Sequence, residues 1–374
     1  MINYGRHYID TQDINAVVKV LKSNFLTQGP TVKEFEKNLK KKFKCKYCTT
    51  VNNATTALYL IGKVLNWNST TKVACPAMSF VASSNCILFH SSKPIFIDIN
   101  QKDYCIDVKL LEKEIKKDRS IKYAIITDYA GQPADWVSLR HLANKYKITL
   151  INDNCHSIGS KIENDIGYAC KYADFVVHSY HPVKTITTGE GGAIFTNSKK
   201  NYEKIVLLKN HYQKKDLTNW NTEVSGLGYN SRMSDINAAL GIQQLKKLEK
   251  FVKKRRLIAN FYNKMLCGID GIILPEEKQN FYHSYHLYAI QINFDKFKIS
   301  KVDFLNKLKK KKINLQIHYK PAYKFKLYKK YNLFNYPNSD LFYKRTISLP
   351  VYYSLSKNKL KIIIKNIQNV LKIR

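Results

Sequence analysis

The chain has 374 residues, of which 44% are hydrophobic and 12% aromatic, a composition that excludes a disordered chain. It has no run of about 18 apolar residues, so no membrane-spanning helix is expected. The formal net charge is +35, and such an excess occurs in proteins that bind nucleic acid or anionic membranes. Because the lysines recur along the whole chain, and no helix-turn-helix or zinc finger is evident, we expect neither partner.

Neither a leader sequence nor a metal site is expected. The first residues lack the charged and then apolar layout of a signal peptide, which predicts a cytoplasmic protein. The eight cysteines are scattered, and Cys45 and Cys48 form the one CxxC pair. A zinc site would need a second such pair, or two histidines at ligand spacing. We therefore interpret these thiols as buried or incidental.

The N-terminal segment predicts two helices. The first follows an N-cap at Asp10 or Thr11, and its apolar residues share one face: Ile14, Val17, Val18 and Leu21. The second begins near Thr31 and is expected to bury its own apolar residues: Val32, Phe35, Leu39 and Phe43.

Short apolar runs then alternate with helical stretches. The runs lie at residues 49–53, 72–75, 94–99, 123–129 and 148–153, and two more follow closely at 173–180 and 191–197. Short continuous apolar strands between helices are typical of a parallel sheet that is covered on both faces. The first part of the chain is therefore expected to be an α/β domain.

The pattern changes in the last third of the chain. A long helical stretch from about Ser234 to Leu266 is predicted to break near Glu249. After it come a strand, a helix, a strand and a final helix, predicted at residues 285–293, 301–312, 313–319 and from 356 onward. This order predicts a large domain over residues 1–250 and a small α+β domain over residues 251–374.

Three sets of residues could carry chemistry at strand ends. Lys184 lies in the segment HSYHPVKTITTGEGGAIFTN, between two predicted strands. Asp153 closes the predicted strand at residues 148–153, and ligands of open α/β sheets bind at such carboxyl ends. The segment NNATTAL, residues 52–58, leads a strand into a helix whose first N–H groups suit a phosphate. Taken singly, the lysine could be a surface residue and the turn an ordinary capped helix.

Taken together, these motifs resemble a known family. VNNATTAL, MSFVASSN, NDNCHSIGS, the lysine segment and GYNSRMSDINAALGIQQL occur in the order of the DegT/StrS-type sugar-nucleotide aminotransferases. The resemblance covers nearly the whole chain. It implies the fold type I of pyridoxal 5′-phosphate (PLP) enzymes, with a large, mostly parallel seven-stranded sheet domain and a small C-terminal domain. It also implies a homodimer with shared active sites.

The resemblance implies a role for each matching residue. Lys184 would hold the cofactor covalently, Asp153 would face the pyridine nitrogen, and His156 would lie near the phenolic oxygen. Phe80 would stack on the ring, and the phosphate would be held by Ala54, Thr55 and Ser179, with Asn230 reaching it from the partner subunit. The candidates for sugar contact are Tyr4, His181, His318 and Tyr319. His156, His318 and Phe80 have an alternative as core residues.

Within the family, LTQGP, DYAGQP and HYKPAYKFKLY resemble the members that act in pseudaminic acid biosynthesis. This implies a UDP-linked 4-keto-6-deoxy sugar that receives nitrogen from glutamate at carbon 4. We expect these three segments to report on the sugar, because they lie outside the cofactor motifs. The alternatives are a D-series 4-keto sugar of bacillosamine or lipopolysaccharide type, or a non-catalytic regulatory protein. The chain departs from most relatives at Ala54, Asn152, Asn154 and Cys155.

Overall fold

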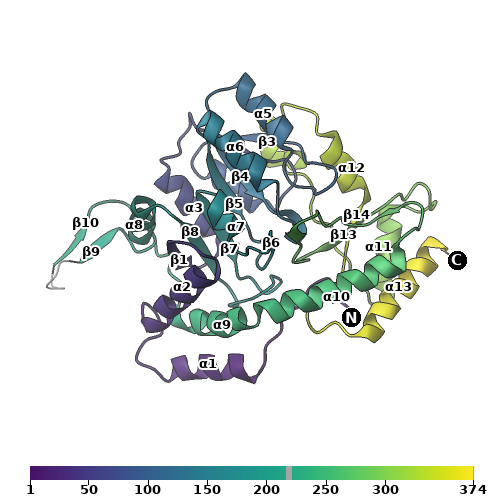
Figure 1. The fold of residues 1–374 in the computed structure, drawn as a ribbon, viewed down its shortest axis with the longest axis horizontal. Helices are drawn as coiled ribbons and strands as arrows, with labels where there is room; N and C mark the ends of the chain where they lie inside the picture. The colour runs from purple at the N-terminus through teal and green to yellow at the C-terminus, as the bar shows by residue number, and fades with distance from the viewer. Residues whose placement is uncertain (216–220, 374) are drawn as a thin grey trace.

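The computed structural model describes residues 1–215 and 221–373. Its centre is a seven-stranded sheet in the order β1-β8-β7-β5-β4-β2-β3, in which β8 alone runs antiparallel to its neighbours (Figure 1). The strands are β1 (Tyr47–Val51), β2 (Lys72–Pro76), β3 (Lys93–Ile97), β4 (Ile121–Thr127), β5 (Thr149–Asp153), β7 (Phe175–Ser179) and β8 (Gly192–Thr196). The sequence analysis predicted each of them.

Helices cover both faces of this sheet, which explains why its strands are apolar on both sides. One face packs against α2 (Pro30–Lys42), α5 (Val108–Lys117), α6 (Trp136–Tyr146), α7 (Tyr168–Tyr172) and α9 (Asp235–Lys246). The other face packs against α3 (Ala54–Val64), α4 (Ala82–Leu88) and α8 (Lys199–Leu208). This is the mostly parallel, doubly covered sheet that the sequence predicts.

Helix α1 (Thr11–Leu21) forms with the predicted cap at Asp10, but its apolar face does not pack within the chain. Ile14 and Leu21 are each 54% exposed, whereas Asp13 and Val20 are the buried residues of the helix. Asp13 is buried because Lys247 and Gln244 of the neighbouring α9 region bind its carboxylate. The helix therefore packs through Asp13 and Val20 and presents Ile14, Val18 and Leu21 to the outside.

The small domain is built on a three-stranded antiparallel sheet, β11-β13-β14 (Ile272–Ile273, Tyr288–Ile292 and Thr346–Leu349). Its core also takes in the later part of α10 (Leu248–Leu266), together with α11 (Lys301–Lys310) and α13 (Lys357–Leu371). The N-terminal residue Ile2 joins this core through a bridge to Ile313.

The prediction of a strand at residues 313–319 is wrong. Only Ile313 and Gln316 form isolated bridges, to Ile2 and Ser348 respectively, and the rest of the segment is irregular. Its alternating apolar residues satisfy the period of a strand, but the register needed for a continuous ladder is lost between the two bridges. The segment instead turns toward the large domain.

The two domains are closely joined. The break predicted near Glu249 falls at Lys247, between α9 and α10 (Figure 1), so the boundary expected at residue 250 lies inside α10. Residues 322–336, which include η2 (Ala322–Lys324) and η3 (Lys326–Tyr331), pack in the core of the large domain. A short pair links β6 (Lys161–Ile162) to β12 (Phe281–Tyr282), and α12 (Pro337–Arg345) packs near β13. The domain division stays a prediction.

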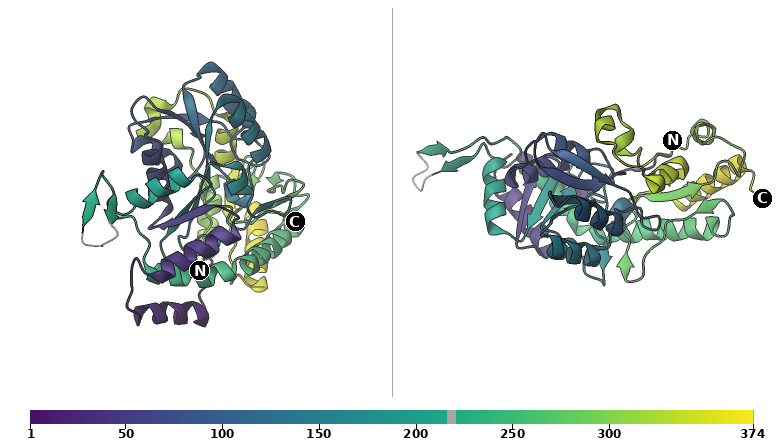
Figure 2. Two further views of the ribbon diagram at one scale, coloured as in Figure 1. Left: turned by 60° about the vertical axis from the view of Figure 1, so that its left-hand side comes forward. Right: turned by 90° about the horizontal axis from the view of Figure 1, so that it is seen from above.

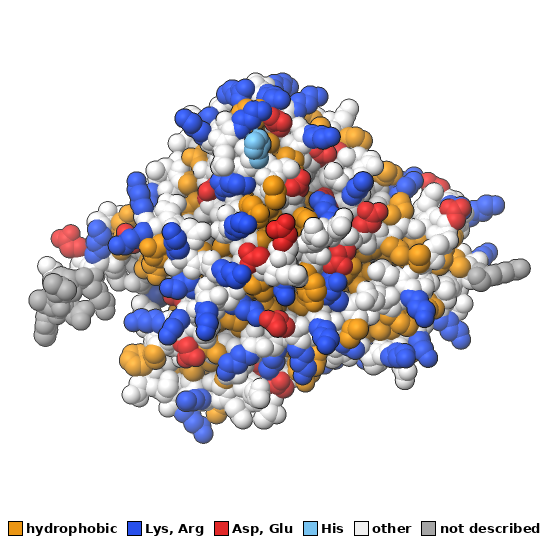
Figure 3. All heavy atoms as spheres, in the orientation of Figure 1, with side chains coloured by type: hydrophobic (Ala, Val, Ile, Leu, Met, Phe, Trp, Pro, Cys, Tyr) orange, Lys and Arg blue, Asp and Glu red, His pale blue; other side chains and the backbone are white. Residues whose placement is uncertain are grey.

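One hairpin stands away from the body of the molecule. Strands β9 (Gln213–Lys215) and β10 (Thr222–Val224) pair antiparallel and project beyond α8 in each view (Figures 1 and 2). Lys and Arg side chains are scattered over the face in Figure 3 instead of forming one patch. Within residues 1–215 and 221–373, no helix is long and apolar enough to cross a membrane.

Candidate active site

Three strand ends meet beside the start of α3. In the sheet register Gly192 of β8 lies opposite both Val51 of β1 and Ser179 of β7. A Cβ on Gly192 would lie 2.8 Å from the backbone nitrogen of Ala54, so only glycine lets the strand approach the helix this closely. Asn53 caps α3 by accepting the N–H of Thr56 at 2.8 Å. The Ser179 hydroxyl and the first N–H groups of α3 thus face the same space.

Lys184 lies on a pinned loop between β7 and β8. The Tyr180 carbonyl accepts both the Thr187 hydroxyl, at 2.9 Å, and the Thr188 N–H, at 3.0 Å, which closes the loop. Gly189 has a φ of +81°, which provides the turn back into β8. Burial lowers the pKa of the Lys184 amine, while Cys155 and Asp153 oppose that shift. A lower pKa increases the fraction of neutral amine, which is the form that acts as nucleophile or base.

Asp153 ends β5 and is buried, being 5% exposed. Its carboxylate accepts the Ser83 hydroxyl at 2.6 Å and the Cys155 N–H at 3.4 Å. Ser83 lies in the first turn of α4, so the packing of that helix against the sheet sets the direction of the carboxylate. The result is a fixed negative group at the end of the sheet.

His156 and Tyr319 form a hydrogen-bonded pair in the cleft. The Nε2 atom of His156 lies 2.9 Å from the Tyr319 hydroxyl, and its Nδ1 atom accepts the Ala130 N–H at 3.3 Å. Burial, reinforced by Lys184 and His318, lowers the pKa of His156 well below its usual value. Burial raises the pKa of the Tyr319 phenol. The imidazole is therefore neutral and the phenol keeps its proton.

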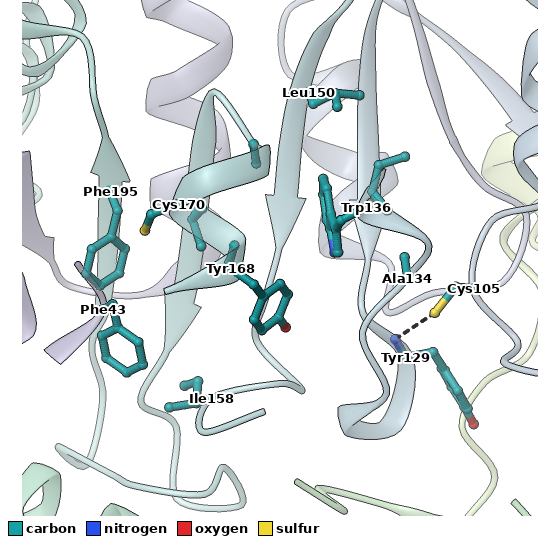
Figure 4. Packing of buried hydrophobic residues seen from close by; sticks show 14 of the residues in the cluster. Phe43, Cys105, Tyr129, Ala134, Trp136, Leu150, Ile158, Tyr168, Cys170 and Phe195 are labelled. Atoms are coloured by element: carbon teal, nitrogen blue, oxygen red, sulfur yellow. Dashed lines mark hydrogen bonds between the residues drawn. The ribbon is translucent and has the colours of Figure 1, made fainter. Parts of the chain in front are cut away.

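Behind this pair lies the turn DYAGQP, whose Asp128 is fully buried. The Asp128 carboxylate accepts hydrogen bonds from five donors: the Ala134 N–H, Trp136 Nε1, Asn152 Nδ2, Asn154 Nδ2 and the Tyr168 hydroxyl. Figure 4 shows Tyr129, Ala134 and Trp136 near Cys105, whose Sγ accepts the Tyr129 N–H at 3.4 Å.

This network gives a structural role to Asn152 and Asn154, two positions at which the resemblance implies a departure from most relatives. The amides of Asn152 and Asn154 both donate to Asp128, so an acidic residue at position 152 would place two carboxylates together in the core. The turn lies under the site and does not line the cleft. Neither DYAGQP nor residues 26–30 line the described cleft, and the expectation that these segments report on the sugar stays a prediction.

The strand ends, the lysine loop and residues 316–319 enclose a cleft of about 570 Å³, which is within the usual size of ligand pockets. The expected site residues that line it are Tyr4, Ala54, Thr55, Phe80, Asp153, His156, Ser179, His181, Lys184, His318 and Tyr319. Phe80 is 53% exposed, so it is not a core residue, and its ring is free to stack on a flat ligand.

His318 and Tyr4 form the wall on the small-domain side. The Nδ1 atom of His318 lies 2.8 Å from the Ser348 hydroxyl, and the rings of His318 and Tyr4 are 5.0 Å apart. Burial, with a smaller effect of Lys184, lowers the pKa of His318 to about 3. His318 is thus both largely buried and part of the cleft, and it stays uncharged.

Asn230 is the one expected residue that this cleft does not include. It is exposed and bridges to Asn210, and the carbonyl of the next residue, Ser231, accepts the Asn52 N–H at 3.1 Å. Asn230 therefore lies on the outside of the segment that leads into α3. This position is compatible with a role in another subunit.

Several residues that the sequence analysis did not propose as site residues complete the site. Asn53, Thr127, Cys155, Glu190 and Gln316 line the cleft, and Ser83 binds Asp153 beneath it. Ser83 and Glu190 lie inside quoted motifs, so their position next to a strand end or the lysine loop was a usable signal. Gln316 had none, because its contact depends on the irregular path of residues 313–319.

The arrangement fits PLP. The start of α3, where Ala54 and Thr55 line the cleft together with Ser179, suits a phosphate. A buried carboxylate, Asp153, suits a protonated pyridine nitrogen, and a lysine with a lowered pKa suits covalent attachment. Among the described residues, no group of three or more His, Cys, Asp or Glu side chains could hold a metal ion. The fold and the cleft are those of a PLP-dependent fold type I enzyme.

Comparison with known proteins gives the family. Residues 7–368 match the DegT/DnrJ/EryC1/StrS aminotransferase family, and the chain belongs to that family. The UDP-4-amino-4,6-dideoxy-N-acetyl-beta-L-altrosamine transaminase of Campylobacter jejuni is 36% identical over 367 residues, covering 97% of this chain and 96% of that protein. The spore coat polysaccharide biosynthesis protein SpsC of Bacillus subtilis is 29% identical over 381 residues, covering 99% and 97%.

Among solved structures, the fold is similar to Helicobacter pylori PseC, an aminotransferase of pseudoaminic acid biosynthesis. The TM-score is 0.93 at 31% identity, and the match covers 99% of both chains. The protein is thus a PLP-dependent aminotransferase, as the motifs predicted.

Proposed function

We propose that the enzyme transfers the amino group of glutamate to carbon 4 of a UDP-linked 4-keto-6-deoxy sugar, on the route to pseudaminic acid. The observation that carries this proposal is the similarity to the UDP-4-amino-4,6-dideoxy-N-acetyl-beta-L-altrosamine transaminase of Campylobacter jejuni, which is 36% identical and covers 97% of the chain. The similarity to Helicobacter pylori PseC, at 31% identity over 99% of both chains, agrees with it. SpsC matches over a similar length, so family membership alone does not select the sugar.

The residues of the cleft would divide the work as follows. Bound PLP supplies an electron sink. Lys184 would hold it, and the free amine of Lys184 would accept a proton at Nζ; the lowered pKa keeps a larger fraction of that amine neutral and able to do so. Asp153 would keep the pyridine nitrogen protonated. Phe80 would stack on the ring, and Ala54, Thr55 and Ser179 would hold the phosphate.

The substrate proposal predicts strong discrimination between epimers. The proposed substrate is UDP-2-acetamido-2,6-dideoxy-β-L-arabino-hexos-4-ulose. With glutamate as donor, its kcat/KM should be about 100-fold above that of its D-series epimer, because a misplaced hydroxyl leaves buried polar groups unpaired. His318 is the main proposed contact, with Tyr4 and His181 beside it in the cleft that Tyr319 also lines. Side-by-side kinetics with both sugars measure this ratio.

A higher specificity constant for the D-series sugar would reject the pseudaminic assignment and leave the aminotransferase intact. No turnover of any nucleotide 4-keto sugar, by protein that carries its cofactor, would favour the non-catalytic alternative. The cytoplasmic location expected from the sequence stays a prediction.

We also propose that the enzyme is a homodimer whose active sites are shared. The outward apolar stripe of α1 continues into Phe25, 54% exposed, and Leu26, 47% exposed. Contiguous exposed apolar side chains of this kind are typical of an interface between subunits. Asn230 lies outside the cleft of its own chain, which supports a contact to the phosphate of the partner's cofactor.

Shared sites predict recovery of activity in mixed dimers. Lys184→Ala and Asn230→Asp chains, each inactive alone, should regain about a quarter of wild-type activity when mixed equally, because half the dimers are hybrids with one intact site. Mixing Lys184→Ala with Asp153→Asn chains is the matched control and should give no recovery, since both residues lie in one chain's cleft. Equal behaviour of the two mixtures, with subunit exchange demonstrated, would contradict shared sites.

A further inference from the structure

We infer that Tyr319, oriented by His156, donates a hydrogen bond to the phenolic oxygen of bound PLP. Its position in the cleft, its single hydrogen bond to His156, and the strand order around Asp153 lead to this assignment. It goes beyond the proposed substrate, because it concerns the cofactor and holds for any keto sugar. His156 is then a positioning residue, and Tyr319 is a catalytic residue.

The first step is the direction of the hydrogen bonds. A neutral imidazole carries one N–H, and its Nδ1 atom already accepts the Ala130 N–H. The proton therefore lies on Nε2, which donates to the Tyr319 hydroxyl oxygen at 2.9 Å. Within the described residues the Tyr319 hydroxyl has no other partner, so its own O–H is left to point into the cleft that the side chain lines.

The Ala130 N–H that sets this direction is held rigidly. Ala130 has a φ of +58°, in the left-handed region, and Gly131 has a φ of +106°. The carbonyl of Ala130 accepts the Leu287 N–H at 3.1 Å, and that of Gly131 accepts the Ser160 hydroxyl at 2.7 Å. A Cβ on Gly131 would lie 2.5 Å from the Ser284 hydroxyl, so the turn needs glycine for space as well as for its conformation.

The second step is the place of the donor along the sheet. The phosphate position lies at the ends of β8 and β7, Asp153 ends β5, and Ala130 follows β4, on the far side of β5 from β7. In PLP the phosphate arm and the phenolic oxygen flank the axis from the ring nitrogen on opposite sides. With the phosphate toward β7 and the nitrogen at Asp153, the phenolic oxygen faces β4, where His156 and Tyr319 meet.

The third step is the charge of the surroundings. The titratable groups around this point are Tyr4, Tyr129, Asp153, Cys155, Lys184, His286 and His318. The ring of His286 lies 4.6 Å from that of His156 and is tilted against it by 43°, and burial holds both rings neutral. The Tyr129 hydroxyl has no proton left for the cofactor, because it donates to the His318 carbonyl. Tyr319 is therefore the phenol with a free proton beside His156.

This assignment predicts a spectroscopic shift in Tyr319→Phe. The nitrogen that joins Lys184 to the cofactor titrates, and loss of its proton leaves the negative phenolic oxygen without a partner. A donated hydrogen bond stabilises that charge and lowers the pKa of the nitrogen. Removing it should raise the pH midpoint of the visible absorption band by about one to two units, the usual size for a hydrogen bond to a charged group.

Tyr4→Phe is the matched control, since Tyr4 lines the same cleft and contacts His318 without bonding to His156; its midpoint should stay unchanged. The effect of His156→Ala on the midpoint should shrink in the Tyr319→Phe background, because His156 acts through the phenol. Site-specific replacement of Tyr319 by a fluorotyrosine keeps the side chain, strengthens the donor and should lower the midpoint.

An unchanged midpoint in Tyr319→Phe, together with a raised midpoint in His156→Ala, would overturn the inference and give the contact to His156 itself. An unchanged midpoint with fluorotyrosine would also overturn it. These outcomes are read from the bound cofactor in the absence of substrate. They are therefore independent of which sugar the enzyme uses.

Discussion

Lys184→Ala is expected to lose covalent cofactor attachment and to lower turnover by on the order of five powers of ten, as removal of a nucleophile does in other enzymes. The pinned loop from Tyr180 to Thr188 does not depend on the lysine side chain, so the fold should be kept. The measurements are borohydride trapping, the visible band near 400 nm and single-turnover amino transfer.

An exposed lysine provides the control for this prediction. Lys171→Ala makes the same change of charge on α7, away from the cleft, and should leave attachment and turnover as in the wild type. Near wild-type amino transfer by Lys184→Ala would show that another residue holds the cofactor. Arginine is no substitute at position 184, because it stays protonated and cannot act as nucleophile or base.

Asp153→Asn is expected to lower kcat by several powers of ten, corresponding to on the order of several kcal/mol of transition-state stabilisation. The neutral amide cannot keep the pyridine nitrogen protonated, while its oxygen can still accept the Ser83 hydroxyl. Cofactor binding should weaken far less than turnover. Kinetics and cofactor titration of the same preparation separate the two effects.

Ser83→Ala tests whether the charge or the hydrogen bond is responsible. It removes the 2.6 Å contact to Asp153 but keeps the carboxylate, so a loss of about tenfold in kcat is expected, the size of one hydrogen bond to a charged group. Equal turnover of Asp153→Asn and the wild type would count decisively against the role of Asp153. A larger loss of kcat in Ser83→Ala than in Asp153→Asn would show that the orientation of the side chain at position 153, and not its charge, is responsible.

Much of the fold could be predicted because it depends on local patterns. Each of the seven central strands is a short apolar run between helices, and burial on both faces makes such runs easy to recognise. The capped starts of α1, α3 and α13 follow from side chains that accept N–H groups one turn ahead. Residues 313–319 show the limit of this reasoning, since alternation without a partner in register does not make a strand.

By itself, the sequence placed Lys184 in a loop and Asp153 at a strand end, because both positions are set by neighbours close in the chain; the roles that the resemblance implies for them stay predictions. The tertiary structure alone decided which face of α1 is buried, and it brought Asn152 and Asn154 to Asp128. It also joined His156 to Tyr319, 163 positions apart in the chain. Such contacts depend on how the two domains pack together, and no local period of hydrophobic or polar residues encodes that packing.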